Sequence, residues 1–311
     1  MKIICVEPIG INNAHAENLK QNFAIQGHQF VFYSDRKEDE NILIDRLKDA
    51  DVGIISNIPL TKNVLSRCTN LKFLAVAFTG LDHIAMDYCE AHGIEVKNAG
   101  GYATTSVAEL VVGLILDLQR KITEMNVLTR EHQMRGTFLG KELKGKIVGI
   151  IGTGQIGLET AKLLLAFGCK ILAYSRTQKE NAQKLGIEYM SLENLIQKSD
   201  IISLHLPLTP EATHIINKQN ISLCKPSALI INTARGKVID TDALIWALEH
   251  NVISGAGIDV YDSEPPVYDD KLLHCPNCIF TPHIAFATQE SFAKRIEIVF
   301  NKINEWLATK K

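Results

Sequence analysis

The sequence predicts an α/β protein with two doubly wound parallel sheets. Short apolar runs alternate with amphipathic stretches over residues 1–100 and again from residue 147 onward. This alternation is typical of strand–helix–strand units, in which helices cover both faces of a parallel sheet. A glycine-rich turn in the middle of the chain follows an apolar strand and opens a helical pattern. Because the chain has 311 residues, it is long enough for two hydrophobic cores.

The first half of the chain predicts five strands and four short helices. The strands are expected at residues 3–6, 30–33, 52–56, 73–77 and 94–96, and the helices at 14–25, 41–47, 61–65 and 84–92. A pattern without proline and with apolar residues at helical spacing then runs from 104 to about 135. It predicts one long helix. The glycines at 136, 140 and 145 mark a loop after it.

The second half repeats the alternation from a strand that begins at Ile147. Further strands are expected at residues 170–174, 201–204, 228–231, 254–258 and 279–281, and helices at 155–167, 192–198, 217–223 and 242–249. A final helix at 289–307 belongs to neither sheet by sequence order. We therefore expect it to fold back on the first domain.

Composition limits the function classes. A formal net charge of −2 gives no electrostatic reason to expect nucleic acid or an anionic membrane surface as a partner. The longest apolar run near the middle of the chain, residues 110–116, is too short to span a bilayer. No signal peptide precedes the first strand, and seven scattered cysteines fit reduced thiols, so we expect a cytoplasmic protein. Cys275 and Cys278 are interpreted as two small buried hydrophobic residues rather than a redox or metal pair.

The glycine-rich turn reads Gly-Thr-Gly-Gln-Ile-Gly at residues 152–157. Gly152 permits a tight turn, Gly154 lets the backbone approach a pyrophosphate, and Gly157 lets the helix pack closely on the strand. The N–H groups of the helix that begins near Gln155 and Ile156 are suited to phosphate oxygens. The strand–turn–helix context predicts a dinucleotide site.

Three polar residues follow predicted strands of the second half: Arg235, Glu264 and His283. The carboxyl ends of parallel strands border the ligand crevice. A guanidinium binds carboxylates in a bidentate fork, an imidazole transfers protons near neutral pH, and a carboxylate orients the imidazole. Taken singly, Arg235 and Glu264 could be solvated loop residues, and His283 could cap the following helix.

These residues lie in motifs that together resemble the D-2-hydroxyacid dehydrogenase family. The resemblance covers essentially the whole chain, and it is carried by the segments 79–83, 101–109, 152–157, 231–236, 257–261, 264–266 and 281–285. It implies a flavodoxin-like substrate domain formed by residues 1–100 and 285–311. A Rossmann nucleotide-binding domain formed by residues 101–284 would be inserted into it.

The resemblance also implies a catalytic set and a substrate site. Arg235, Glu264 and His283 would be catalytic, with His283 as the acid–base and Glu264 favouring its imidazolium form. The substrate carboxylate would lie on backbone N–H groups around Thr79 and Gly80 and on Arg235, in a pocket that also includes Phe78 and His283. Cofactor contacts are expected at Gly152, Gly154, Gln155, Ile156, Gly157, Ser175, Arg176, Thr177, Leu206, Pro207, Thr213, Thr233, Ala234, Asp259, Thr105 and Val107.

The segment after the second strand of the nucleotide domain bears on the choice of cofactor. It reads Ser175-Arg176-Thr177, without the Asp or Glu that accepts the ribose hydroxyls of NAD. Arg176 is suited to a 2′-phosphate, so we favour NADP(H). If Arg176 instead stacks on adenine, NAD(H) remains possible.

The motifs are similar to the glycerate dehydrogenase/hydroxypyruvate reductase branch, so we expect a D-2-hydroxyacid dehydrogenase acting on hydroxypyruvate or glyoxylate. Alternatives are a D-lactate- or D-3-phosphoglycerate-type dehydrogenase, formate- or phosphite-type oxidation, and a nucleotide-gated binding module like the corepressors. Phe78 stands where the family often has a small residue. The apolar 104–135 pattern exceeds what one domain can cover and predicts a homodimer with a two-fold interface.

Overall fold

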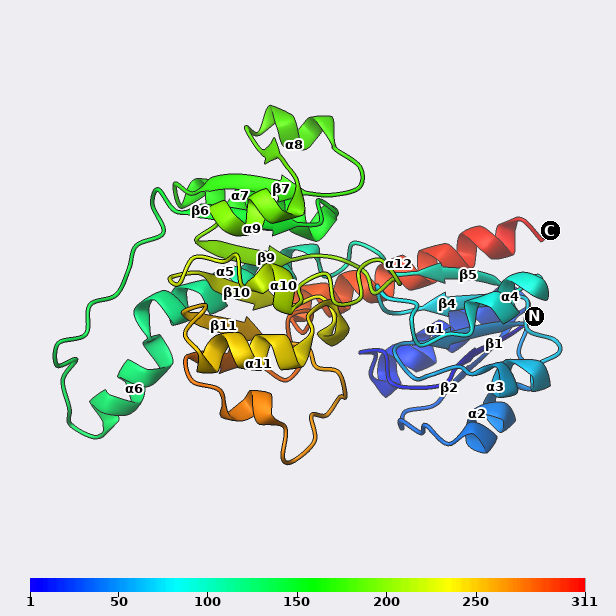
Figure 1. Cartoon of the computed structure of the whole chain (residues 1–311). Helices are drawn as coiled ribbons and strands as arrows, with labels where there is room; N and C mark the ends of the chain where they lie inside the picture. Colours follow the sequence, from blue (N-terminus) through cyan, green and yellow to red (C-terminus); the bar gives the residue numbers. More distant parts are fainter. Residues whose placement is uncertain (311) are drawn as a thin grey trace. The chain divides into compact units, whose positions relative to one another are not determined.

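The computed structural model describes residues 1–310 and divides the chain into two compact units (Figure 1). Unit 1 consists of Met1–Ala103 together with the chain from Ala287 onward, and unit 2 is Thr104–Phe286. Each unit is a parallel sheet with helices on its faces, so the fold class predicted from the sequence is confirmed.

Unit 1 contains a five-stranded sheet in the order β2-β1-β3-β4-β5, in which all strands are parallel. This order is the flavodoxin-like one. The strands are β1 (Lys2–Cys5), β2 (Gln29–Phe32), β3 (Val52–Ile55), β4 (Phe73–Val76) and β5 (Glu95–Asn98). The helices between them are α1 (Asn13–Ile25), α2 (Glu40–Leu47), α3 (Lys62–Arg67) and α4 (Met86–Ala91).

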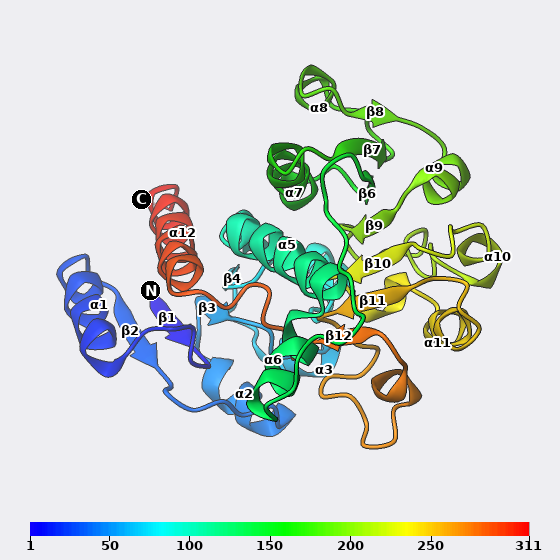
Figure 2. The same cartoon turned by 90° about the vertical axis from the view of Figure 1, so that its left-hand side faces the viewer.

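The C-terminal helix α12 (Gln289–Ala308) returns to unit 1, as expected from the sequence. A capping box between Thr288 and Ser291 begins it. Its apolar face packs beside α1 and on β4 (Figure 2). The Phe300 ring lies 6.2 Å from that of Phe23 and the Trp306 ring 5.0 Å from that of Phe73, so aromatic contacts fix the helix on the sheet.

Unit 2 contains a seven-stranded parallel sheet in the order β12-β11-β10-β9-β6-β7-β8. The order reverses between β6 and β9, which makes a topological switch point at their carboxyl ends. The strands are β6 (Ile147–Ile151), β7 (Lys170–Tyr174), β8 (Glu188–Tyr189), β9 (Ile201–Leu204), β10 (Leu229–Asn232), β11 (Gly255–Ile258) and β12 (Cys278–Phe280). The helices are α5 (Thr104–Arg120), α6 (Ile122–Arg130), α7 (Gln155–Ala166), α8 (Glu180–Lys184), α9 (Leu192–Lys198), α10 (Lys218–Ile221) and α11 (Thr241–Glu249), with single 3₁₀ turns at Gly236–Val238 and Lys271–His274.

The prediction of one long helix over 104–135 was wrong. Helix α5 ends at Arg120, Lys121 adopts the left-handed conformation with φ +49°, and α6 begins at Ile122. Asp117 accepts hydrogen bonds from the N–H and hydroxyl of Thr123, which stabilises the break. Helix α6 buries none of its residues, so its apolar side chains do not pack into the hydrophobic core of unit 2. Short α8 and β8 were also missed, because segments of five and two residues carry little periodicity.

Cys275 and Cys278 are half-buried, whereas the sequence predicted two small buried hydrophobic residues. Both nevertheless pack against the core under β11 and α11. Within residues 1–310 all seven cysteines are free thiols, and no three His, Cys, Asp or Glu side chains gather as a metal site. Over the same residues, no helix has the length and apolarity needed to cross a bilayer.

Candidate active site

Each of the three glycines in the turn after β6 occupies a position that disfavours a side chain, and the reason differs from one glycine to the next. Gly152 has φ +99°, and a Cβ there would lie 2.4 Å from the carbonyl oxygen of His205. A Cβ on Gly157 would lie 2.0 Å from the oxygen of Gly152, so the start of α7 approaches the turn as only glycine permits. Gly154 faces open space. A side chain there would obstruct a ligand rather than the fold.

The first turn of α7 is open for an anion. Its N-cap, Gly154, supplies no side-chain acceptor for the N–H groups that follow at Gln155 and Ile156. Such N–H groups and the helix dipole attract phosphate. The buried Thr153 hydroxyl is instead bonded to the hydroxyl of Tyr189 on β8, at 2.9 Å. Tyr189 thus holds the turn from β8, two strands away in the sheet, and nothing in the sequence pattern predicts this contact.

Ser175, Arg176 and Thr177 follow β7 directly, and no carboxylate lies among them. A carboxylate does approach from elsewhere. A hydrogen bond within Glu211 lowers the pKa of that residue most, a hydrogen bond with Thr209 adds to this, and the charge of Arg176 lowers it further. Glu211, in the loop after β9, was missed because it lies 35 positions from Arg176 in sequence. The other predicted cofactor residues of this loop are Leu206, Pro207 and Thr213.

The loop after β10 is organised by Asn232, which is 1% exposed. Its side chain donates to the carbonyl of Arg235 at 2.8 Å and accepts from the N–H of Ala234 at 3.0 Å. The loop therefore presents Arg235 at the end of the strand. The buried hydroxyl of Thr233 has no hydrogen-bond partner among residues 1–310. A buried polar atom without a partner fits a bound ligand that would complete it.

His283 and Glu264 form a hydrogen bond at the carboxyl edge of unit 2's sheet. Nδ1 of His283 lies 2.6 Å from Oε2 of Glu264, and Oε1 accepts from the N–H of Tyr261 at 3.2 Å. Burial by itself raises the pKa of Glu264, but the hydrogen bond and charge of His283, the Tyr261 N–H and the charge of Arg235 together hold that pKa below its usual value. Glu264 is therefore ionised at neutral pH. Nδ1 is therefore the ring nitrogen that faces the carboxylate, and this contact fixes the orientation of the imidazole.

Asp259 fixes the loop that carries His283. Its fully buried carboxylate accepts from the hydroxyl of Thr281 at 2.5 Å and from the N–H groups of Ile284 and Ala285 at 2.9 and 3.0 Å. Its carbonyl accepts from the N–H of His283, which has φ +53°. These contacts show a role in supporting the His283 loop. The cofactor contact expected of Asp259 stays a prediction, as do those of Thr105 and Val107 in the first turn of α5.

In unit 1, Phe78, Thr79 and Gly80 follow β4. The carbonyl of Phe78 accepts from the N–H of Ala99 at 3.0 Å, and that of Thr79 accepts from the side chain of Asn98 at 2.6 Å. The N–H groups of Thr79 and Gly80 donate no hydrogen bond within residues 1–310. Two consecutive N–H groups beside carbonyls that are tied back make a concavity suited to a carboxylate. Asn98, like Asn232, was missed at the sequence level.

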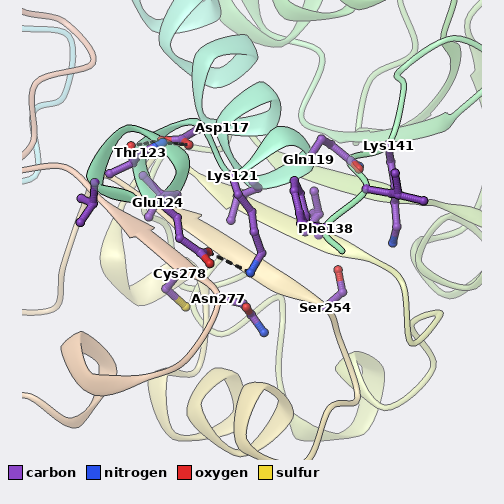
Figure 3. Close-up of a pocket in the computed structure, with 15 residues that line it drawn as sticks. Asp117, Gln119, Lys121, Thr123, Glu124, Phe138, Lys141, Ser254, Asn277 and Cys278 are labelled. Carbon is purple, nitrogen blue, oxygen red and sulfur yellow. Dashed lines mark hydrogen bonds and ion pairs between the residues drawn. The ribbon is translucent and has the colours of Figure 1, made fainter. Parts of the chain in front are cut away.

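The cavity shown in Figure 3 is not part of the candidate active site, because it lies at the amino ends of strands in unit 2. It has a volume of about 400 Å³, and it is bordered by Leu229, Ser254 and Cys278 at the amino ends of β10, β11 and β12. Lys121 and Glu124, which both line the cavity, form an ion pair with an N–O distance of 2.9 Å. The glycine turn and the His283–Glu264 hydrogen bond lie at the opposite, carboxyl edge of the same sheet.

Comparison with known proteins places the chain in a family. Residues 112–285 match the family model described as "D-isomer specific 2-hydroxyacid dehydrogenase, NAD binding domain". The chain is 38% identical over 269 residues to a glyoxylate reductase of Thermococcus litoralis, a match that covers 83% of this chain and 81% of the relative. It is 40% identical over 257 residues to a hydroxypyruvate reductase of Thermotoga maritima, with 81% and 83% covered.

A solved structure described as an acyclic imino acid reductase in complex with NADPH and D-Arg superposes with a TM-score of 0.90 at 30% identity. That superposition covers 100% of this chain and 98% of the other. The matched family model, the relatives and the architecture agree. The protein therefore belongs to the D-2-hydroxyacid dehydrogenase family and is an NAD(P)-dependent oxidoreductase.

Proposed function

We propose that the protein reduces glyoxylate and hydroxypyruvate to the corresponding 2-hydroxyacids, with D-glycerate as the product of the latter. The observation that carries this proposal is the 2.6 Å contact between His283 and Glu264 at the sheet edge that also bears the glycine turn. An imidazole oriented by an ionised carboxylate can donate a proton to a carbonyl oxygen. The names of the two relatives supply the substrate class.

In this mechanism His283, protonated, donates from Nε2 to the oxygen on C2 of the substrate. A nicotinamide cofactor, when bound, supplies or accepts the hydride. Glu264 stabilises the imidazolium and keeps its ring oriented. Arg235 binds the substrate carboxylate and stabilises negative charge on the oxygen. In unit 1, the N–H groups of Thr79 and Gly80 are donors suited to a carboxylate. In the oxidative direction His283 accepts the hydroxyl proton instead.

We further propose a preference for NADP(H). The support is the cation Arg176, flanked by the hydroxyls of Ser175 and Thr177, at the end of β7. Glu211 opposes this preference, because its negative charge is near enough to interact with that of Arg176 and would repel a 2′-phosphate. Residues 152–157 would hold the pyrophosphate, and the buried hydroxyl of Thr233 would gain a partner. A cytoplasmic location remains the prediction made from the sequence.

The proposed assembly is a homodimer with a two-fold interface around α6. Helix α6 buries no residue, and large apolar side chains on it and in the segment after it are exposed: Val127 at 47%, Met134 at 87% and Leu139 at 77%. In Figure 1, α6 extends away from the sheet of unit 2. Val127 and Leu139 also line the cavity of Figure 3. A second copy would cover these side chains, which are costly to leave in water.

A turnover assay tests the reaction. Glyoxylate, hydroxypyruvate, pyruvate, phenylpyruvate and phosphohydroxypyruvate are each supplied with NADH and with NADPH. We expect the highest kcat/KM for glyoxylate or hydroxypyruvate. A higher value for pyruvate or the phosphorylated acid would assign the D-lactate or D-3-phosphoglycerate type, and no turnover of any acid would favour the binding module. One arm of the assay contains glyoxylate together with an alkylamine, which form an imine in solution. This arm tests for imine reduction, because the chain is similar in structure to an acyclic imino acid reductase.

A further inference from the structure

Helix α12 places two cations beneath the loops at the carboxyl edge of unit 1's sheet. Arg295 and Lys302 lie seven residues apart, so they share one face of the helix. Arg295 is 3% exposed, and Lys302 makes a partly buried contact. Neither side chain forms an ion pair within residues 1–310. Each cation is directed at backbone and hydroxyl oxygens of the loops instead.

Arg295 joins the loops that follow β1, β3 and β4. One of its nitrogens, Nη2, donates to the carbonyl of Ile9 at 2.7 Å, and Nη1 donates to the hydroxyl of Ser56 at 3.4 Å. The same hydroxyl donates to the carbonyl of Ala77 at 3.3 Å, next to Phe78. Glu7 also fixes Ser56, because its carboxylate accepts from the Ser56 N–H at 2.7 Å. One guanidinium thus sets the separation of three loops.

Lys302 reaches the same edge by another route. Its ammonium donates to the carbonyl of Asn98 at 2.5 Å, where β5 ends. The side chain of Asn98 donates to the carbonyl of Thr79 at 2.6 Å and accepts from the N–H of Gly100 at 3.2 Å. A rotation of Asn98 would therefore turn the Thr79–Gly80 peptide and redirect the N–H of Gly80. The N–H of Thr79 lies on the preceding peptide, whose Phe78 carbonyl is held by the N–H of Ala99.

Stability alone is a poor explanation for these two cations. Taking a guanidinium out of water is expensive, and apolar side chains of similar volume often serve a core as well or better. The Nε of Arg295 is buried without an acceptor among residues 1–310, which adds to that cost. What the cations supply, and an apolar side chain would not, is a fixed direction for the loop carbonyls.

We propose that Arg295 and Lys302 are positioning residues that aim the N–H groups of Thr79 and Gly80 at the substrate carboxylate. This inference rests on the proposed function, since it deepens the account of the same substrate site. A misplacement of about 1 Å in such a contact can cost up to ~10²-fold in rate. The nucleotide turn belongs to unit 2, so nucleotide affinity should not respond.

The test compares Lys302→Met with Lys294→Met, which removes an exposed lysine from the same helix. We expect Lys302→Met to raise KM for the 2-oxoacid about fivefold to tenfold, with a smaller change in kcat and an unchanged Kd for NADPH. Lys294→Met should match the wild type. Arg295→Lys should act in the same direction, and Arg46→Lys, at a second buried arginine of unit 1, is its control.

Binding of oxamate to the NADPH-loaded protein, measured by calorimetry, gives a readout that does not need turnover. A weaker oxamate affinity in Lys302→Met alone supports the positioning role. An unchanged KM and oxamate affinity in that variant would overturn it, even if Tm falls. Equal losses in both lysine variants would also overturn it. Wild-type protein that binds oxamate yet reduces none of the acids would count against the proposed function instead.

Discussion

The contact between His283 and Glu264 makes a pH-dependent prediction. Glu264→Gln removes the charge that stabilises the imidazolium, so the pH above which reduction slows should move to the acid side. The pH profile of kcat/KM measures this shift. The control is Asp262→Asn, at an exposed carboxylate nearby that accepts from Thr241. If the Glu264→Gln profile is the same as that of the wild type, Glu264 is not the partner of His283 in catalysis.

Removal of the imidazole should separate chemistry from nucleotide binding. His283→Ala is expected to lower kcat by ~10²–10⁴-fold, the usual contribution of general acid–base catalysis. The Kd for NADPH should stay nearly constant, because the glycine turn does not depend on His283. Single-turnover kinetics and a fluorescence titration measure the two quantities. A kcat within about threefold of the wild type would exclude His283 as the proton donor.

Arg176 and Glu211 should act in opposite directions on cofactor choice. Arg176→Ala is expected to lower kcat/KM for NADPH about tenfold or more and to change that for NADH little, because one charge-assisted phosphate contact is lost. Glu211→Gln should increase the preference for NADPH, because a nearby negative charge that repels the 2′-phosphate disappears. Steady-state kinetics with both cofactors measure the ratio. Equal losses for NADH and NADPH in Arg176→Ala would contradict a contact to the 2′-phosphate.

At the scale of elements, the two glycines at the start of α7 should respond differently to alanine. Gly157→Ala places a Cβ against the oxygen of Gly152, so the helix must move and Tm should fall. Gly154→Ala meets open space, so Tm should stay while KM for the nucleotide rises. Thermal unfolding and nucleotide titration measure the two effects. A Gly157→Ala protein with unchanged Tm would show that α7 tolerates a wider separation from β6.

Asp200 joins the start of β6 to the segment before β10. Its carboxylate accepts from the N–H of Ile147 at 2.9 Å and from Lys225 at 2.8 Å. Burial alone raises the pKa of Asp200, but these hydrogen bonds and the nearby lysines hold it below its ordinary value. A lowered folded-state pKa gives stability that is present above the unfolded value, near 3.8, and is lost as pH falls through the folded value.

Asp200→Asn should therefore lower the free energy of unfolding by about 1–2 kcal/mol at pH 7. The difference from the wild type should shrink as the pH falls below about 4, where the wild-type carboxylate also becomes neutral. Urea unfolding at several pH values measures it. A difference that is constant from pH 7 to pH 3 would mean that the charge of Asp200 contributes nothing.

At the scale of the whole molecule, the exposed side chains around α6 predict a dimer. Light scattering at micromolar concentration should give twice the mass of one chain. Leu139→Glu, which places a charge among the apolar side chains of this surface, should shift the equilibrium toward monomer. Leu185→Glu, at an exposed leucine just after α8, is the matched control. A wild-type protein that has the mass of one chain would end the proposal.

The sequence alone determined the fold class and the glycine turn, for local reasons, and it predicted the catalytic set. Strand and helix periodicities are properties of neighbouring residues, and the turn at 152–157 needs glycine whatever surrounds it. Arg235, Glu264 and His283 were predicted as a set because each follows a predicted strand, and the ends of parallel strands meet at one edge, while their catalytic roles came from the resemblance to the family. The helical periodicity gave a wrong prediction at Lys121, because the apolar pattern continues through this residue although the helix ends before it.

Only the tertiary structure decided which side chains support the site. Asn98, Asn232 and Asp259 act through hydrogen bonds to loops, and Glu211 approaches Arg176 from another loop. Arg295 is more than 200 positions from the loops that it joins. Such contacts depend on how distant segments pack, and a single polar residue in a sequence carries no periodic signal of its partner. The residues that support the candidate site could therefore be identified only from the tertiary structure.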